Sequence, residues 1–192
     1  MIAGSIATIL MVGVPVVLVV LVLWAVGIYN GLIRLRNLVQ EAWRQIDVEL
    51  QRRHNLIPNL VETVKGYAAH EKGTFEEVTR ARNMAVAPGS SVAEQAQQEN
   101  VLTQALGRLI AVAEAYPDLK ANQNFQQLQQ ELTNTEDRIA AGRRFYNANV
   151  RELNTKIEVF PGNIVAGMFG FKRADYFEIE DPAARQTPTV QF

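Results

Sequence analysis

The sequence predicts an all-α protein: an N-terminal transmembrane helix, an elongated antiparallel bundle of three long helices, and an irregular C-terminal tail. Two observations predict this fold. Residues 2–33 carry no charged side chain, and beyond them apolar residues recur every three or four positions, with no strand-like alternation of comparable length. The expected parts are an anchor (1–28), a bundle running up, down and up with its second helix interrupted (29–158), and the tail (159–192).

The apolar N-terminal run is long enough to cross a bilayer. The stretch "IATILMVGVPVVLVVLVLWAVGI" alone exceeds the roughly 20 residues that a hydrocarbon core about 30 Å thick requires. A cleaved signal peptide is the alternative, and Ala25-Val26-Gly27 is a passable cleavage site. However, a charged n-region is missing and the run is too long for an h-region. We therefore expect residues 1–28 to be retained and to contact the lipid bilayer.

Basic residues follow the expected span, whereas only the α-amine precedes it. The arginines concerned are Arg34, Arg36, Arg44, Arg52 and Arg53. The positive-inside rule then predicts a single-pass protein whose C-terminal domain lies in the cytoplasm.

The first bundle helix is expected over residues 29–70. Its apolar stripe comprises Leu32, Leu35, Val39, Ala42, Ile46, Leu50, Ile57, Leu60, Val61, Val64 and Ala68. Pro58 interrupts the pattern, because proline removes a main-chain donor and crowds the carbonyl four residues earlier. Gly73 should end the helix, and Thr74-Phe75-Glu76-Glu77 has the form of a capping box that opens the next.

The other two helices are expected over residues 75–116 and 123–158. "AVAPGSS" breaks the first of them, and a capping box at Ser91 and Glu94 restarts it. Asn122 or Asn124 can cap the last helix, which should end before Phe160-Pro161-Gly162. Helices of roughly 36 to 42 residues span about 55 to 63 Å, so three matched helices with short connections predict the up-down-up bundle.

Composition excludes several classes of function. The net charge of −1 gives no electrostatic footprint for nucleic acid, and the chain has no cysteine and two histidines. There is no phosphate-binding loop, no G-x-S-x-G and no zincin motif. We therefore expect no catalytic residue, no metal, no cofactor and no nucleic-acid partner.

The polar residues of the first helix admit two interpretations. His54 falls on the apolar face, which favours a core histidine paired with a backbone carbonyl over a ligand or a pH switch. Arg52 and Arg53 are more typical of a solvated pair than of a phosphate clamp. The asparagines either bond across helices or face solvent; they are Asn55, Asn59, Asn147, Asn149 and Asn154. Trp43 is expected to anchor a helix pair.

The up-down-up order brings the apolar segment "FPGNIVAGMFGF" beside "RRHNLIPNLVETV" at the distal end of the bundle. In this arrangement Phe160, Ile164, Val165, Met168, Phe169 and Phe171 would cover Ile57, Val61 and Val64. The segment would then be either a structural cap or part of a docking surface. The hypothetical partner-binding residues are Arg52, Arg53, His54, Asn55, Pro58, Asn59, Phe160, Phe169 and Phe171.

Several long motifs resemble one bacterial family over about residues 29–171. They are "YNGLIRLRNLVQEAW", "QIDVELQRRHNLIPNLVETVKGYAAHEKGTFEEVTRAR", "AVAEAYPDLKANQNFQQLQQELTNTEDRIA", "YNANV" and "FPGNIVAGMFGF". In this order they are similar to the LemA family. The resemblance implies a single-pass protein of the bacterial inner membrane, with an N-terminal anchor, a helical bundle and no established enzymatic activity. Gly142 departs from the alanine expected there.

Two functional classes remain. The favoured one is a membrane-anchored, non-catalytic scaffold or adaptor that presents its bundle to unidentified protein partners, with a homo-oligomer left open. The alternative is a membrane-tethered module that binds a small anionic or peptide ligand at the distal end of the bundle. A polar pocket at residues 52–59 would favour the second class, and a solid-sided bundle the first.

Overall fold

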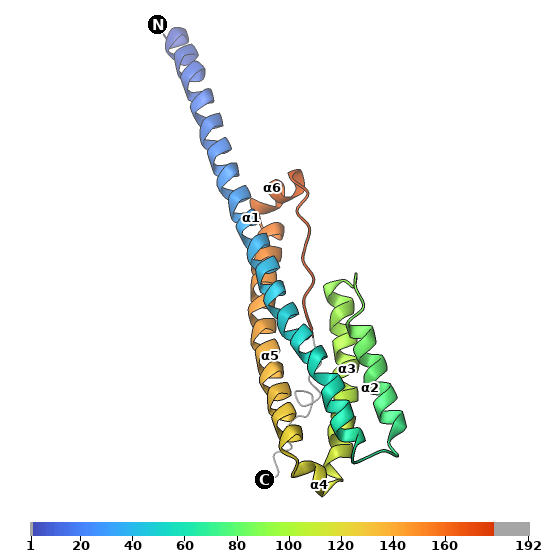
Figure 1. The fold of residues 1–192 in the computed structure, drawn as a ribbon. Coiled ribbons are helices and arrows are strands. Elements are labelled where there is room, and N and C mark those ends of the chain that lie inside the picture. Colours follow the sequence, from blue (N-terminus) through green and yellow to red (C-terminus); the bar gives the residue numbers. More distant parts are fainter. Residues whose placement is uncertain (1, 179–192) are drawn as a thin grey trace, which may run out of the picture. The chain divides into compact units, whose positions relative to one another are not determined.

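The computed structural model describes the main chain of residues 2–178, with the side chains of Met11 and residues 13–178. Residues 179–192 of the expected tail lie outside this range. The described chain has helices and no strand, which confirms the all-α class. The helices are α1 (Ile2–Lys65), α2 (Lys72–Ala85), α3 (Val92–Glu114), α4 (Pro117–Lys120), α5 (Gln123–Glu158) and α6 (Gly162–Met168) (Figure 1).

The chain divides into two compact units. The N-terminal unit comprises Met1–Glu41 and Ala148–Ala174, and the central unit comprises Ala42–Asn147 and Asp175–Phe192. Both α1 and α5 contribute residues to each unit.

The long helix α1 confirms the predicted apolar stripe, since all its members from Leu32 to Val64 are buried, as is Ala68 just beyond the helix. The helix ends at Lys65, a few residues earlier than expected. The predicted capping box at Thr74 is wrong, because α2 begins at Lys72. The amides of Thr74 and Phe75 already bond to the carbonyl of Glu71, so the first helical turn forms before Thr74.

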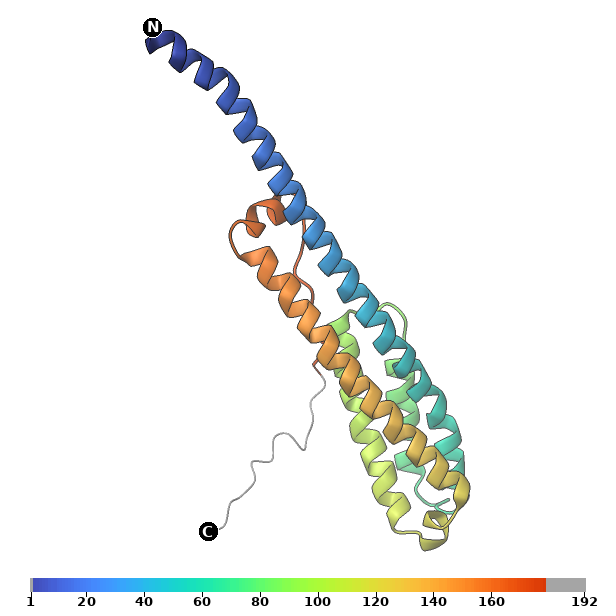
Figure 2. The same cartoon turned by 90° about the vertical axis from the view of Figure 1, so that its left-hand side faces the viewer.

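In the central unit, residues 75–116 form two antiparallel helices rather than one interrupted helix. Figures 1 and 2 show α2 and α3 side by side, joined by a turn at residues 86–91. Gly89 has a φ of 91°, a conformation that favours glycine and reverses the chain here. The predicted capping box of α3 is confirmed: the Glu94 amide donates to Ser91 Oγ, and the Ser91 amide to the Glu94 carboxylate. "AVAPGSS" is therefore a reversal.

This reversal makes α5 antiparallel to α1. Residue numbers rise on one helix as they fall on the other in three neighbouring pairs: Arg52 with Glu131, Glu49 with Arg138, and Ile46 with Gly142. A Cβ at Gly142 would lie 3.0 Å from Ile46 Cγ1, so the glycine allows the close approach of the two helices. The cap of α5 is Asn122, whose side-chain oxygen accepts the Phe125 amide.

The core of the central unit combines α1, α2, α3 and α5. Fully buried residues from each include Leu60, Val78, Leu109 and Ile139. Leu119 of α4 is also buried and closes one end of the same apolar cluster. Helices with one apolar stripe each bury it most simply against antiparallel neighbours, and this unit does so with four.

In the N-terminal unit, α6 and the following residues pack on the part of α1 that directly follows the apolar run. The Phe169 and Phe171 rings lie 4.7 Å and 5.8 Å from the Tyr29 ring, measured between centroids. Tyr29 precedes Pro58 by about eight helical turns. The predicted packing of residues 160–171 on residues 54–64 is therefore wrong. The reason is the unpredicted reversal between α2 and α3, which inverts the direction of α5.

An extended segment follows α6, and side-chain amides of α5 satisfy its main chain. In the N-terminal unit, Asn154 donates to the carbonyl of Ala174 and accepts from its amide, both at 2.9 Å. In the central unit, Asn147 makes the same pair of bonds with Phe177. These two asparagines therefore act as amide clamps on the main chain, a role that neither predicted interpretation included.

Candidate functional site

The candidate site is a buried ionic cluster in the central unit, formed by Arg53 and His54 of α1 with Glu99 of α3 and Glu136 of α5. His54 follows Leu50 by four residues and therefore lies on the buried stripe of α1, as predicted. Glu99 precedes Leu102 by three residues on the buried face of α3. Helical spacing thus places His54 and Glu99 on buried faces of their helices.

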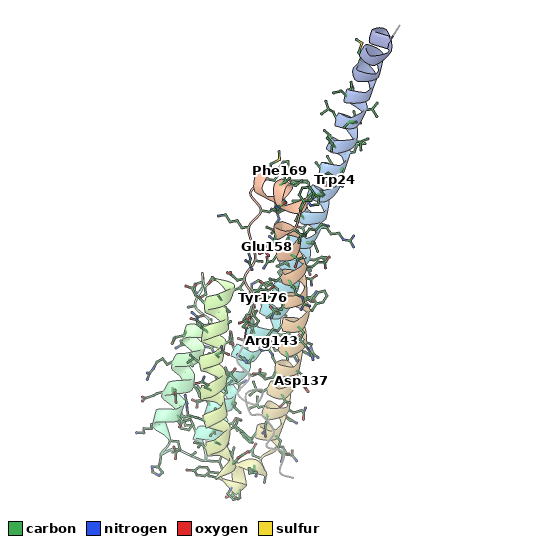
Figure 3. All side chains as sticks on the ribbon, turned by 180° about the vertical axis from the view of Figure 1, so that it is seen from behind. Trp24, Asp137, Arg143, Glu158, Phe169 and Tyr176 are labelled. Carbon is green, nitrogen blue, oxygen red and sulfur yellow. The ribbon has the colours of Figure 1, made fainter. Side chains whose placement is uncertain are left out.

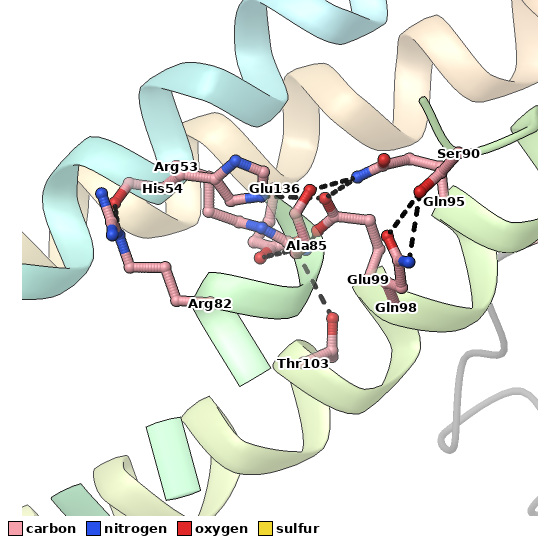
Figure 4. Close-up of polar contacts among 10 residues, drawn as sticks. All are labelled: Arg53, His54, Arg82, Ala85, Ser90, Gln95, Gln98, Glu99, Thr103 and Glu136. Atoms are coloured by element: carbon pink, nitrogen blue, oxygen red, sulfur yellow. Dashed lines mark hydrogen bonds and ion pairs between the residues drawn. The ribbon is translucent and has the colours of Figure 1, made fainter. Parts of the chain in front are cut away.

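Arg53 has no exposed surface and is held by three side chains from two other helices (Figure 4). Its guanidinium forms an ion pair with Glu99 and a second with Glu136 at 2.5 Å, and it contacts the hydroxyl of Thr103 at 3.4 Å. The prediction that Arg52 and Arg53 form a solvated pair is wrong for Arg53. Arg52 is exposed and bonds to Glu131 at 3.1 Å.

Glu99 lies at the centre of the cluster. One carboxylate oxygen is 2.8 Å from His54 Nε2 and also accepts a hydrogen bond from Gln95 Nε2. Burial alone would raise the pKa of Glu99, but the hydrogen bond with His54 and the charge of Arg53 outweigh it and lower the pKa. Glu99 is therefore ionised at neutral pH. The predicted partner of His54, a backbone carbonyl, is wrong, because its partner is this carboxylate.

Pro58 explains a further contact of the cluster. In a helix the carbonyl of residue 54 would accept from the amide of residue 58, and proline has no such amide. Arg82 Nε of α2 donates instead to the His54 carbonyl oxygen at 2.8 Å. Pro58 itself is exposed and does not end α1. The proline thus frees an acceptor on α1 that a side chain of α2 uses.

A polar hollow of about 460 Å³ lies against this cluster. Its polar walls come from Asp47, Gln51, Asn55, Arg82, Ser90 and Gln95, and His54 also lines it. One acidic and one basic side chain therefore face the hollow beside amides and a hydroxyl. In the part of the chain that the structure describes, no group of three or more His, Cys, Asp or Glu side chains could hold a metal ion.

Trp43 packs beside the hollow, as predicted for a helix-pair anchor. Its ring contacts Tyr146 of α5 at 5.6 Å and Phe177 at 5.2 Å. The Tyr146 hydroxyl donates to the carbonyl of Asp175, and burial together with the charge of Asp175 raises the pKa of Tyr146 to about 12. The contact of Phe177 with Trp43 attaches the described end of the chain to α1, and the hydrogen bond from Tyr146 attaches it to α5.

The nine residues predicted to bind a partner belong to both units. Arg52 to Asn59 belong to the central unit, where Arg53 and His54 are buried and Asn55, Pro58 and Asn59 are exposed. Phe160, Phe169 and Phe171 belong to the N-terminal unit. The partners Glu99 and Glu136 were missed, although a glutamate three residues before Leu102 on an apolar stripe was a usable signal for a buried carboxylate.

Comparison with known proteins identifies the family. The model of the LemA family matches residues 42–192. The chain belongs to the LemA family. The family member named protein LemA from Metamycoplasma hominis is 32% identical over 145 residues, which cover 73% of this chain and 64% of its own length.

Two further relatives of this LemA-family chain are named as magnetosome proteins. Magnetosome protein MamQ 2 of Paramagnetospirillum magneticum is 32% identical over 187 residues, covering 84% of this chain and 68% of its own length. Magnetosome protein MamQ of Magnetospirillum gryphiswaldense is 29% identical over 187 residues, which again cover 84% of this chain and 68% of its own length. Among the described residues, one helix, α1, is long and apolar enough to cross a membrane. The LemA-family chain is a membrane-associated helical protein.

Proposed function

We propose that this LemA-family protein is a non-catalytic scaffold or adaptor, anchored in the bacterial inner membrane by residues 1–28. One observation carries the proposal: α1 continues without a break from exposed apolar residues, such as Val14 and Leu23, to the buried stripe that begins at Leu32. A helix that is apolar all round is suited to lipid, whereas one with a single stripe is suited to a bundle. The proposed anchor and the buried stripe that α1 contributes to the folded units thus belong to one continuous helix.

The ionic cluster supports a structural role over a chemical one. Arg53, Glu99 and His54 are buried and paired with one another, so the described groups best suited to acid–base chemistry are used inside the central unit. Such a protein acts by what its surfaces bind. The surface proposed for a protein partner is the hollow, because it has polar walls, a neighbouring tryptophan and the exposed Asn55.

Photo-cross-linking in intact cells tests the adaptor role. A photoreactive residue at Asn55 should capture a defined protein, or a second copy of this chain if it forms homo-oligomers. The same residue at Asp137, which is also exposed in the central unit, is the matched control. Capture at Asn55 should be lost when Gln51 is changed to Lys. Equal capture at both positions would remove the hollow from the proposal, and no capture at Asn55 would contradict the adaptor role.

We propose a single-pass topology with the C-terminal domain in the cytoplasm, based on the arginines that follow the apolar run. The chain has no cysteine, so Asn55→Cys would be its one thiol. A membrane-impermeant maleimide should leave this thiol unlabelled in spheroplasts and label it after lysis. Labelling before lysis would reverse the topology.

The second candidate function is the binding of a small ligand in the hollow, whose volume is in the range of ligand pockets. A peptide fits it better than an anion. Arg53 is buried and already neutralised by two carboxylates, and the hollow itself has one acid and one base. Native mass spectrometry of the purified protein would reveal a retained ligand, which Arg82→Ala should release.

A further inference from the structure

The segment Val159–Phe171 in the N-terminal unit has no charged side chain. It leaves the end of α5, forms α6 and returns, and an ion pair between Glu158 and Arg173 at 2.9 Å closes its base. Such a short uncharged segment cannot span a bilayer. It therefore needs another explanation for its apolar composition.

One face of α6 accounts for part of that composition, because it packs on the unit. Gly162, Val165 and Ala166 are buried. A Cβ at Gly162 would overlap the main-chain oxygen of Lys156, so only glycine permits this approach. The inner face thus fixes α6 on the end of α5.

The outer face of α6 is also apolar, although it is exposed. Phe160 is 75% exposed and Met168 76%, and Ile164 and Phe169 are more than half exposed. Ile164 and Met168 lie four residues apart and therefore on one side of the helix. A helix on a water-facing surface normally presents polar residues outward. Nothing among the described residues covers this face.

The location of this face indicates the occupant. Phe169 and Phe171 pack on Tyr29, the residue that directly follows the apolar run of α1 and precedes its first arginine, Arg34, by five positions. Arg36 follows Tyr29 by about two turns of α1. Its Cζ atom lies over the Phe171 ring, 5.5 Å from the ring centroid. Figure 3 shows Phe169 and Trp24 at neighbouring levels of the N-terminal unit. If residues 1–28 cross the membrane, the outer face of α6 lies where α1 emerges from it.

We propose that residues 159–169 are a second membrane contact, in which Phe160, Ile164, Met168 and Phe169 insert into the surface of the bilayer that α1 crosses. Apolar side chains of such in-plane elements enter about 5–10 Å into the boundary of head groups and acyl chains. Lys172 and Arg34 are exposed in the same unit and can approach lipid phosphates. This inference rests on the proposed anchor.

The test uses the absence of cysteine in the chain. Met168→Cys, Val19→Cys and Val48→Cys are each prepared in the full-length protein, labelled with an environment-sensitive fluorophore and reconstituted in phosphatidylcholine–phosphatidylglycerol vesicles. All three native side chains are apolar and more than half exposed, and Val48 belongs to the central unit. Brominated lipids then report the depth of each label.

The proposal expects the label at Met168 to be blue-shifted, and quenched more by bromines near the head groups than by bromines near the chain ends. The label at Val19 should be quenched most by bromines near the chain ends. The label at Val48 should be quenched by neither kind of brominated lipid. Quenching at Val19 without quenching at Met168 overturns the second contact and leaves the anchor intact. No quenching at Val19 contradicts the anchor itself. The proposal is also overturned if the fluorophore at position 168 stays in water in vesicles, while a cross-linker on the same cysteine captures a protein in native membranes. In that case the face binds a protein.

Discussion

The two units differ in how they satisfy their surfaces. The central unit pairs its buried polar side chains with one another or with a partner at the surface: Arg53 with Glu99 and Glu136, and His54 with Glu99. The N-terminal unit is held by aromatic contacts on Tyr29 and by the amides of Asn154, and leaves large apolar side chains exposed on α1 and α6. The first solution suits a protein in water. The second suits contact with an apolar medium, which would remove the exposed apolar side chains of α1 and α6 from water.

This difference explains why one chain combines two kinds of stabilisation. A buried ion pair fixes which helices meet, because leaving either charge unpaired is costly. A surface with exposed apolar side chains instead depends on its surroundings, because removing each of these side chains from water is energetically favourable.

Arg53→Ala should cause the largest loss of stability, because it leaves Glu99 buried without its counter-charge. Breaking a buried pair in this way costs about 3–5 kcal/mol. Arg52→Ala is the matched control, because its pair with Glu131 is exposed on both sides and should contribute about 0–1 kcal/mol. Urea unfolding of the full-length protein in detergent, followed by circular dichroism, measures both. Equal losses would show that burial of the cluster is not what stabilises the central unit.

Asn154→Ala should destabilise the N-terminal unit locally, since it leaves the amide and carbonyl of Ala174 unpaired. The expected cost is about 1–3 kcal/mol. Asn147→Ala removes the same pair of bonds at Phe177 in the central unit. Hydrogen exchange should show faster exchange at residue 174 in the first variant and at residue 177 in the second. Exchange that rises throughout the chain in either variant would contradict a local clamp.

Gly162→Ala should detach α6 from α5 at a cost of about 1–3 kcal/mol, the usual range for overpacking. Gly167→Ala is the control within the same helix, because a Cβ there meets nothing within 4 Å. Tryptic cleavage at Lys172 and Arg173 should accelerate in the first variant and stay unchanged in the second. Unchanged cleavage in both would mean that the inner face of α6 tolerates a methyl group.

Acid should weaken the central unit through Glu99. The pKa of Glu99 is lowered by folding, so its contribution to stability is present above the unfolded value of 4.5 and is lost as the pH falls through the folded value. The urea midpoint of the native chain should therefore drop as the pH falls from 4.5 through the lowered pKa of folded Glu99. Glu99→Gln should be less stable at neutral pH but depend less on acid in this range. Parallel curves would remove Glu99 from the acid response.

Local pattern in the sequence predicted most of the fold. Spacing of apolar residues predicted the stripe of α1, and Ser91 and Asn122 predicted two helix starts, because caps and stripes depend on neighbouring residues. The reversal at Gly89 was missed. A Pro-Gly pair is compatible with both an interruption and a turn, and which one forms depends on the packing of α2 against α3. Because of that one error, the apolar segment around α6 was expected on residues 54–64, whereas its Phe169 and Phe171 pack on Tyr29.

The candidate site was less predictable. The sequence singled out Arg53 and His54, but their partner Glu99 is 45 residues away from His54. Helical periodicity gives the face on which a residue lies and not the residue that it meets on another helix. Arg53 alone gives no sign of burial, because arginine is almost never fully buried unless it is paired. Glu99 and Glu136 supply that partner.

The contact between Arg82 and the His54 carbonyl also constrains the order in which residues 58 and 82 could be substituted during evolution. With Pro58 present, loss of Arg82 leaves the carbonyl without the donor described here, so that step is costly. Replacement of Pro58 first restores a main-chain amide that can bond to the same carbonyl. Arg82 then becomes dispensable at this position. The favourable route therefore changes residue 58 before residue 82, and lineages that follow it would have neither the proline nor the arginine.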